Sequence, residues 1–510
     1  MKNKLEILFV FFVLVIFTIV FAKYYYPDLY SDSVKGSQNS IRMDLEYFKY
    51  KLTFFKDKKI NLADVNANEN AKSIPVLNYH GIADDPYKND IVTDNFEDQM
   101  IALKQAGYNT ITLDDFYAFM HNEKQLPARS VLITFDDGIK SSYFKADPLL
   151  KALDYNAVMF IISKQSIGSG TRYYLSKDEV DDMVKSGRWE IESHARDSHD
   201  YITTDISGRK GHFMSDKIWL SDESRLESDD EYRKRVHDEF VGAKAELESN
   251  FNVKVNAFAF PFGDFGQISI NNPVSKDFVL KDALSVYSDG IFYQVWPNKG
   301  ASYNYPDPAE RSFKRITVLS SWSGKDLVDI LKNGFNKDLP FRDDFTYNKG
   351  WTIVAGQDVI GKNNFALKSL NESNTTMAFL DGSYNFKDYS YNVKIEPFDS
   401  GSVSVIARFK DDENYVSCDF ALGSVKIRES VNGNSTLLSD QKFILSDSTH
   451  LLGITVNKGN ISCSVDNNKV TSADGISESL ANGGVGIKRW SNIDSSLTIK
   501  EVDVEPISSS

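Results

Sequence analysis

Short apolar runs alternate with amphipathic stretches between residues 74 and 334. The apolar runs are rich in β-branched and aromatic residues, as buried strands are, and the amphipathic stretches repeat their apolar residues at helical spacing. Strands that alternate with helices favour a parallel sheet or barrel. The sequence therefore predicts an α/β domain, in which the carboxyl ends of the strands are the expected place for chemistry.

A different pattern begins near Asp343 and continues to about Pro506. Short strands of alternating polarity follow one another, and turn signals such as Asp381-Gly382 separate them. This pattern is typical of an all-β sandwich. We therefore assign residues 74–335 to the α/β domain and residues 340–506 to a β-sandwich that follows it.

The first 26 residues predict export of the chain. Residues 7–22 are almost purely apolar, and they follow a basic start that contains Lys2 and Lys4. At 1.5 Å per residue the run covers about 24 Å, slightly less than the roughly 30 Å hydrocarbon core of a bilayer. A membrane anchor that faces outside the cell and a cleaved signal peptide both fit residues 1–26. The protein is thus expected to be membrane-anchored or secreted.

Residues 27–73 predict a stalk with a short helix. Five apolar residues alternate steps of four and three, which indicates one helix face: Ile41, Leu45, Phe48, Leu52 and Phe55. The stripe lasts about two heptads, too few for a coiled coil. We expect this face to dock on the α/β domain.

Composition narrows the classes of partner. The formal net charge of −14 argues against nucleic acid, because a phosphate-binding surface needs a basic field. Aromatic residues make up 13% of the chain, which suits sugar binding but also an ordinary core. The two cysteines, Cys418 and Cys463, lie near no histidine cluster; a disulfide and separate burial are both open. No protein partner is predicted.

The strongest chemical signal lies at residues 131–135, an apolar run that ends in the adjacent acids Asp136 and Asp137. Because the backbone turns at the end of a strand, both carboxylates can reach one pocket. Further along, a second strand delivers His194 and, after a four-residue gap, His199. Two imidazoles and a carboxylate are the ligand types of a catalytic metal with an open coordination position.

These motifs resemble the polysaccharide deacetylase (NodB-homology) family of carbohydrate esterases. The resemblance covers roughly residues 74–334 and rests on Thr134-Phe-Asp136-Asp137-Gly138, His194-x4-His199 and Phe260-Pro261-Phe262-Gly263. The histidine spacing and an early Asn78-Tyr-His80-Gly81 segment are similar to the branch that contains poly-β-1,6-N-acetylglucosamine deacetylases. In that branch, the strand with the last catalytic histidine comes first, a circular permutation. The resemblance implies a deformed (β/α) barrel.

The resemblance also implies a metal site. Asp137, His194 and His199 would bind a divalent cation, with zinc the first expectation. Cobalt, nickel, manganese or iron are alternatives, because this ligand set admits them and availability often decides.

The remaining roles follow from the same resemblance. Asp136 would be the general base, and the backbone N–H of Phe262 would stabilise the oxyanion. His80 is the candidate general acid. Ala259 stands where many members carry an arginine that orients the catalytic aspartate. Substrate contacts are expected at the turn formed by Pro261, Gly263 and Asp264.

Two features near the histidines leave alternatives open. Asp197 is either a partner that orients an imidazole or a solvated loop residue. Residues 200–231 are polar and partly acidic, which predicts an insertion that rims the site. His212, within this insertion, is either a surface residue or a contact for the substrate.

The expected function is metal-dependent removal of N-acetyl groups from a cell-surface or extracellular polysaccharide, most simply a β-linked N-acetylglucosamine polymer. Two alternatives are an inactive glycan-binding adhesion protein and an esterase for O-acetyl polysaccharides, which would use the same site. The C-terminal region resembles concanavalin-like (laminin-G-like) modules. A carbohydrate-binding role and a spacer role are both open for it.

Overall fold

The structure is a computed structural model, and it describes residues 32–53, 69–85, 90–168, 173–295, 302–355, 357–361, 364–369, 374–398, 400–493 and 495–507. The predicted anchor or signal peptide at residues 1–26 lies outside the described residues. Among the helices that are described, none combines the length and the apolar character that a membrane span requires.

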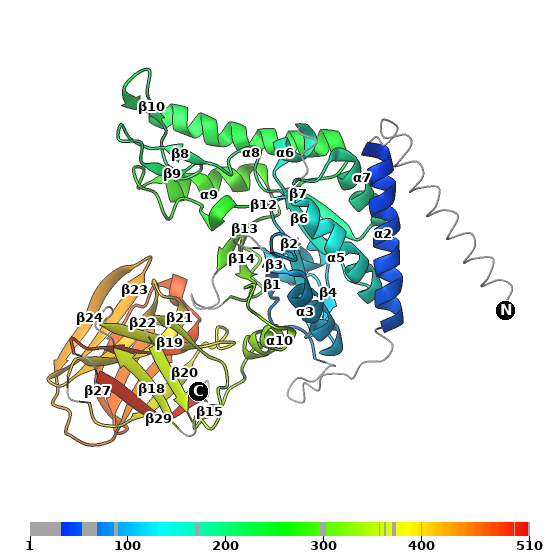
Figure 1. The fold of residues 1–510 in the computed structure, drawn as a ribbon. Coiled ribbons are helices and arrows are strands. Elements are labelled where there is room, and N and C mark those ends of the chain that lie inside the picture. Colours follow the sequence, from blue (N-terminus) through cyan, green and yellow to red (C-terminus); the bar gives the residue numbers. More distant parts are fainter. Residues whose placement is uncertain are drawn as a thin grey trace.

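Parallel strands close into a barrel in the order β1-β14-β13-β12-β7-β6-β5, and β5 pairs back with β1 (Figure 1). The strands are β1 (Val76–Tyr79), β5 (Ser130–Phe135), β6 (Ala157–Ile161), β7 (Trp189–Ser193), β12 (Ala257–Ala259), β13 (Gly290–Val295) and β14 (Ser312–Thr317). Strand β4 (Asn109–Thr110) pairs with β5 outside the ring. The predicted α/β barrel is confirmed, with the first strand of the chain between the last barrel strand and β5.

Helices surround the barrel (Figure 1). They are α3 (Thr93–Gln105), α4 (Leu113–Met120), α5 (Lys140–Leu153), α6 (Ser163–Gly168), α7 (Lys177–Ser186), α8 (Asp229–Phe251), α9 (Ser275–Val286) and α10 (Gly324–Asn333). Helices α7, α8 and α10 each begin with a serine capping box, at Ser176, Ser228 and Ser323. In each box the serine oxygen accepts a backbone N–H that would otherwise lack a partner. Every residue of β5 is buried, because helices cover the outer face of the barrel and side chains of the other barrel strands fill its interior.

Helix α2 (Asp32–Thr53) packs along α5, but not through the predicted face. Tyr50 is buried, Asp44 pairs with Lys151 at 3.4 Å, and the Lys151 ammonium lies over the Tyr47 ring. The predicted apolar stripe is instead 43–76% exposed at Ile41, Leu45, Phe48 and Leu52; Phe55 lies outside the described residues. The predicted contact face is therefore wrong, because the contact is made by tyrosines, an ion pair and the partly buried Met43.

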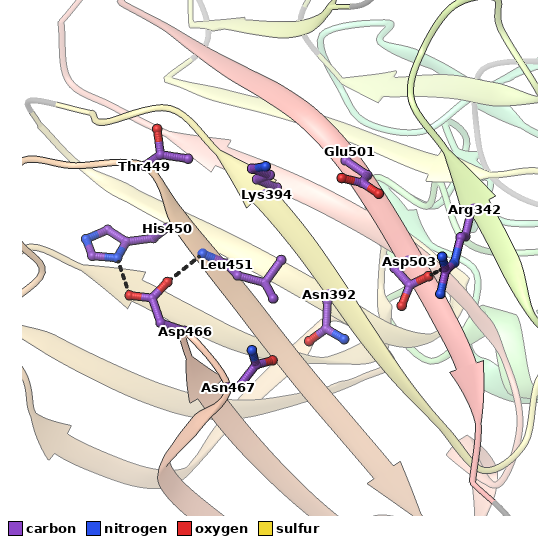
Figure 2. Close-up of a pocket in the computed structure, with 10 residues that line it drawn as sticks. All are labelled: Arg342, Asn392, Lys394, Thr449, His450, Leu451, Asp466, Asn467, Glu501 and Asp503. Atoms are coloured by element: carbon purple, nitrogen blue, oxygen red, sulfur yellow. Dashed lines mark hydrogen bonds and ion pairs between the residues drawn. The ribbon is translucent and has the colours of Figure 1, made fainter.

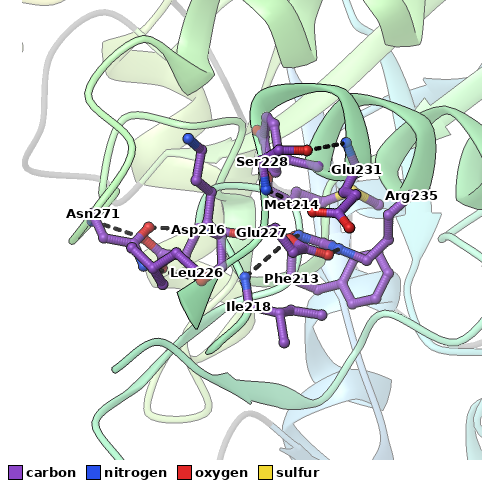
Figure 3. Close-up of polar contacts among 12 residues, drawn as sticks. Phe213, Met214, Asp216, Ile218, Leu226, Glu227, Ser228, Glu231, Arg235 and Asn271 are labelled. Atoms are coloured by element: carbon purple, nitrogen blue, oxygen red, sulfur yellow. Dashed lines mark hydrogen bonds and ion pairs between the residues drawn. The ribbon is translucent and has the colours of Figure 1, made fainter. Parts of the chain in front are cut away.

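Residues 200–231 form two small hairpins that project beside the start of α8 (Figure 1). They are β8 (Tyr201–Thr203) with β9 (Lys210–His212), and β10 (Trp219–Leu220) with β11 (Arg225–Leu226). The buried carboxylate of Glu227 accepts the Ile218 N–H at 2.9 Å and pairs with Arg235 of α8 at 2.8 Å (Figure 3). Arg235 also donates to the carbonyl oxygens of Phe213 and Asp216. One arginine thus holds several parts of the insertion against α8.

The sandwich consists of two antiparallel sheets. One sheet has the order β17-β18-β29-β20-β25-β26-β27, with β15 paired to β29, and the other has the order β16-β19-β28-β21-β22-β23-β24. The strands are β15 (Phe341–Asp343), β16 (Trp351–Ala355), β17 (Gln357–Gly361), β18 (Asn364–Ser369), β19 (Thr375–Leu380), β20 (Tyr389–Ile395), β21 (Ser402–Asp411), β22 (Asn414–Ala421), β23 (Ser424–Val431), β24 (Asn434–Lys442), β25 (His450–Asn457), β26 (Asn460–Val465), β27 (Asn468–Asp474), β28 (Gly484–Trp490) and β29 (Ser495–Pro506). A disulfide between Cys418 of β22 and Cys463 of β26 joins the two sheets. The predicted all-β sandwich is confirmed.

Among the described residues, the sandwich contacts the barrel domain around Gly382 and Tyr384. Tyr384 stacks on Tyr305 with ring centroids 4.5 Å apart, and the Lys337 N–H donates to the Gly382 carbonyl at 2.8 Å. A Cβ atom at Gly382 would lie 1.9 Å from the Phe335 carbonyl oxygen, so only glycine fits this close approach.

The Arg235 clamp generates a prediction about local stability. Arg235→Met should leave the Glu227 carboxylate buried without its partner, at a local cost of about 3 kcal/mol. Amide hydrogen exchange across residues 200–231 should therefore accelerate at least about tenfold, while the barrel strands stay protected. Lys234→Met, a neighbouring exposed position, is the matched control. Unchanged exchange in Arg235→Met would show that the insertion is held by other contacts.

Candidate metal and catalytic site

The three predicted metal ligands converge on one point. Asp137 follows β5, His194 follows β7, and His199 lies on the loop after it. The Nε2 atoms of His194 and His199 lie 3.3 and 3.2 Å from Asp137 Oδ1. One ligand atom from each residue lies within 4.8 Å of the other two. The structure therefore brings the three predicted ligands close enough to share one cation.

The same three residues fit a divalent cation. Asp137 Oδ1 is buried and accepts no hydrogen bond among the described residues. A buried carboxylate oxygen without a donor is costly, and a cation between it and two imidazole nitrogens removes that cost. The ligand set leaves a coordination position open for water or substrate. The ligand types do not identify the metal.

Three turns at the site have backbone conformations that side chains rarely adopt. Asp137, Ala195 and Phe262 have φ values of 71°, 71° and 59°, in the left-handed region. Each follows, or nearly follows, the end of a barrel strand: β5, β7 or β12. Such conformations cost of order 1–3 kcal/mol per residue and cluster at functional sites. The turns direct the Asp137 carboxylate and the Phe262 backbone toward one end of the barrel.

The loop between the two histidines is held by Glu239 of α8, which the sequence analysis missed. One oxygen of its buried carboxylate accepts three successive backbone N–H groups at 2.7–2.9 Å, those of Arg196, Asp197 and Ser198. The side chain of Asp197 points outward and pairs with Lys164. Of the two alternatives for Asp197, the structure supports the solvated loop residue.

The predicted general base, Asp136, is fully buried and paired with an arginine. Arg315 of β14, also fully buried, donates from Nη1 to Oδ1 at 2.6 Å and from Nη2 to Oδ2 at 2.7 Å. Burial by itself raises the pKa of Asp136, but the charge of Arg315, the nearby His194 and His80 imidazoles and the Arg315 hydrogen bonds together outweigh burial, so the pKa lies below its ordinary value. Arg315 thus supplies, from another strand, the arginine that position 259 lacks.

The candidate general acid, His80, lies level with Asp136. Strands β1 and β5 pair in register, with Tyr79 opposite Phe135, so the next residues lie side by side. Gln294 of β13 lies between the two side chains, with its Nε2 3.4 Å from His80 Nε2 and 3.5 Å from Asp136 Oδ2. His80, Gln294 and Asp136 therefore form one polar cluster, of which the sequence analysis missed the glutamine.

Phe262 lies in a stack of aromatic rings next to the metal ligands. Its ring centroid is 4.6 Å from that of His199, 4.7 Å from that of His212 and 5.2 Å from that of Tyr201. His212 Nδ1 lies 2.5 Å from an oxygen of the buried Asp264 carboxylate. The insertion thus contributes two rings to the site, and Asp264 orients one of them.

The predicted substrate contacts at the same turn remain predictions. Pro261 and Gly263 are buried. Gly263 has a φ of 66°, and a Cβ atom there would lie 3.2 Å from the Gln294 Cβ. The glycine therefore allows the turn to pack closely on β13.

Comparisons with known proteins agree with the barrel and its motifs. Residues 123–276 match the polysaccharide deacetylase family model. The Staphylococcus epidermidis poly-beta-1,6-N-acetyl-D-glucosamine N-deacetylase is 30% identical over 217 residues, which cover 41% of this chain and 67% of that protein. The chain belongs to the polysaccharide deacetylase family.

Other relatives are matched over less of their length. The Escherichia coli (strain K12) protein with the same description is 23% identical over 209 residues, which cover 38% of this chain and 31% of that protein. The chain therefore spans about a third of this relative. A solved de-N-acetylase from Aggregatibacter actinomycetemcomitans aligns with a TM-score of 0.44 and 20% identity, covering 51% of this chain and 99% of that one.

The converging ligands predict stoichiometric metal binding. The metal-stripped full chain should bind about one Zn²⁺ with a rise in melting temperature, because the ion binds only the folded state. Asp137→Ala should lose both effects. Asp136→Asn, at the adjacent position that faces Arg315, should retain the ion. Equal metal content in the Asp137→Ala and unsubstituted chains, measured by elemental analysis, would contradict the assignment.

The Glu239 contacts predict a separate effect on metal affinity. Glu239→Ala should weaken Zn²⁺ binding by about 10–100-fold, because the loop between the two histidines loses its common acceptor. Competition with a chromogenic chelator measures the change. Asp238→Ala, an exposed acid on the same helix, should bind as the unsubstituted chain does; equal affinities in both variants would show that Glu239 does not support the site.

Proposed function

We propose that this protein is a metal-dependent N-deacetylase that acts on a cell-surface or extracellular polymer of β-linked N-acetylglucosamine. The observation that carries the proposal is the division of two adjacent carboxylates. Asp137 faces two imidazoles, whereas Asp136 faces Arg315. One acid is therefore available for a cation, and its neighbour stays ionised for proton transfer.

The chemistry of amide hydrolysis suits this division. A divalent cation held at the site would supply a Lewis acid for the acetyl carbonyl and a water of lowered pKa. Asp136, which the Arg315 charge keeps ionised, takes a proton from the attacking water. The Phe262 N–H stabilises the oxyanion, and His80 protonates the departing amine. The amine is a poor leaving group without that proton, so the acid is as necessary as the base.

The choice of polymer has two supports. The relatives named above are described as deacetylases of poly-β-1,6-N-acetyl-D-glucosamine. In addition, Tyr201 exposes more than half of its surface beside Phe262, which offers an apolar ring face next to the metal ligands.

The apolar run at residues 7–22 supports export, which would bring the enzyme to a polymer outside the cell.

Acetate release tests the proposal directly. The full chain, loaded with Zn²⁺, is incubated with β-1,6- and β-1,4-linked N-acetylglucosamine oligomers, and acetate and product masses are measured. The proposal is supported if a chelator abolishes the release of acetate and added metal restores it. The Asp136→Asn variant should release no acetate. A metal-loaded protein that releases no acetate would favour the adhesion alternative, and release only from O-acetylated sugars would favour the esterase.

The ion pair between Arg315 and Asp136 predicts a change in the pH profile. Without the arginine, burial becomes the main influence on Asp136 and raises its pKa. In Arg315→Met the acidic limb of kcat/KM should therefore move to higher pH, with activity lost at pH values where the unsubstituted chain is still active. Arg315→Lys keeps the charge and should shift the limb less. An unmoved limb in a folded Arg315→Met protein would contradict this tuning.

A further inference from the structure

A hollow lined by polar and aromatic side chains lies on the sandwich, apart from the catalytic residues. It has a volume of about 380 Å³ and lies on the outer face of strands β28, β21, β22 and β23. Its lining includes five serines. Small side chains in the middle of a sheet face, with larger ones around them, leave a groove.

Two of these serines have hydroxyl groups that the protein does not use. Ser404 is 7% exposed and Ser417 is 3% exposed, although both lie on the outer face of their sheet. Among the described residues, neither hydroxyl has a hydrogen-bond partner, whereas Ser430 donates to the Glu413 carbonyl. Neither oxygen is among the fully buried atoms that lack a partner, so both hydroxyls are reached from the groove, where water or a ligand can satisfy them. The floor of the groove therefore presents two hydrogen-bonding groups to an occupant.

Aromatic and charged side chains stand around this floor. Trp490, opposite Ser402 in the strand pairing, is 43% exposed, and Tyr415 lies farther along the neighbouring strand. Lys488 and Asp419 flank Ser404 on either side. Acids and bases are therefore both present, so the groove does not select for a strongly charged ligand.

The groove runs along the strands, and the Tyr415 hydroxyl at its far end lies 3.4 Å from the Lys488 ammonium. Trp490 is level with Ser402, which pairs with Ala421, and Tyr415 lies six residues along β22 from that point. Six residues of extended strand cover roughly 20 Å. A pyranose ring has an apolar face that packs on aromatic rings and a rim of hydroxyls that pair with serines and charged groups. These are the groups that the groove offers.

A larger hollow on the other sheet serves as a contrast. It has a volume of about 440 Å³, and no phenylalanine, tyrosine or tryptophan is among the described residues that line it (Figure 2). Four of its polar groups pair with one another, Arg342 with Asp503 at 2.6 Å and His450 with Asp466 at 2.8 Å. Because these groups satisfy each other, this hollow offers less to a sugar than the groove does.

The groove also lies close to the junction with the barrel. Tyr415 packs on the same small apolar cluster as Tyr384, which stacks on Tyr305 of the barrel domain. A chain bound along the groove would therefore be held at a fixed place beside the catalytic domain.

We propose that the groove between Trp490 and Tyr415 is a non-catalytic binding site for a pyranose polymer of the N-acetylhexosamine class. The choice of hexosamine rests on the proposed function, whereas the sugar chemistry rests on the groove. The site retains the polymer while the barrel acts on it. Short oligomers that cannot reach both sites gain nothing from the groove.

Co-sedimentation with insoluble poly-β-1,6-N-acetylglucosamine tests the site. The full chain carries Asp136→Asn, so the polymer is not changed during the measurement. Trp490→Ala and the double variant Ser404→Val with Ser417→Val should weaken retention at least tenfold. Lys394→Ala, in the contrasting hollow, should bind as the parent does. Retention that is unaltered in both groove variants, or a parent chain that does not bind the polymer, would overturn the proposal.

A second measurement separates this inference from the catalytic one. In the chain with Asp136 intact, Trp490→Ala should release acetate from short oligomers at the parental rate and from the insoluble polymer several-fold more slowly. Equal slowing on both substrates would overturn the proposal that the groove binds the polymer. If no acetate is released but retention depends on Trp490, the catalytic proposal fails and the groove stands.

Discussion

The site depends on a buried ion pair between Arg315 and Asp136. Two adjacent carboxylates at the end of a buried strand repel each other, and burial makes both anions costly. Arg315 neutralises one of them through two short hydrogen bonds. The other, Asp137, is left facing two imidazoles, an arrangement that a divalent cation completes. The division of the acid pair into a proton acceptor and a metal ligand is therefore a consequence of where one arginine lies.

The rest of the domain holds this arrangement in place. Strand pairing puts His80 level with Asp136, and Gln294 lies between their side chains. Glu239 fixes the loop between the two metal-binding histidines from the far side. The insertion, clamped by Arg235, brings His212 and Tyr201 against Phe262. Apart from the Arg235 clamp, which is local, these contacts join segments that are distant in the sequence, so the site requires the closed barrel.

The sequence predicts those features that depend on local pattern. The barrel and the sandwich follow from the two hydrophobic periodicities, and the metal ligands follow from a strand-ending Asp-Asp pair and spaced histidines. Arg315 and Glu239 could not be predicted, because an arginine beside a lysine in a short strand and one of several acids on a helix carry no motif. Their roles arise only when distant elements pack together. The exposed stripe of α2 shows the converse: helical periodicity identifies an apolar face but not the surface that covers it.

The most direct test of this account is the position of a bound metal relative to the two acids. A crystal of the full chain grown with Zn²⁺ would be measured at the zinc absorption edge. We predict one anomalous peak within about 2.0–2.2 Å of Asp137, His194 and His199, with Asp136 still paired to Arg315 and outside the coordination sphere. A zinc ion bound by Asp136, or no peak between the two histidines, would contradict the division of the acid pair.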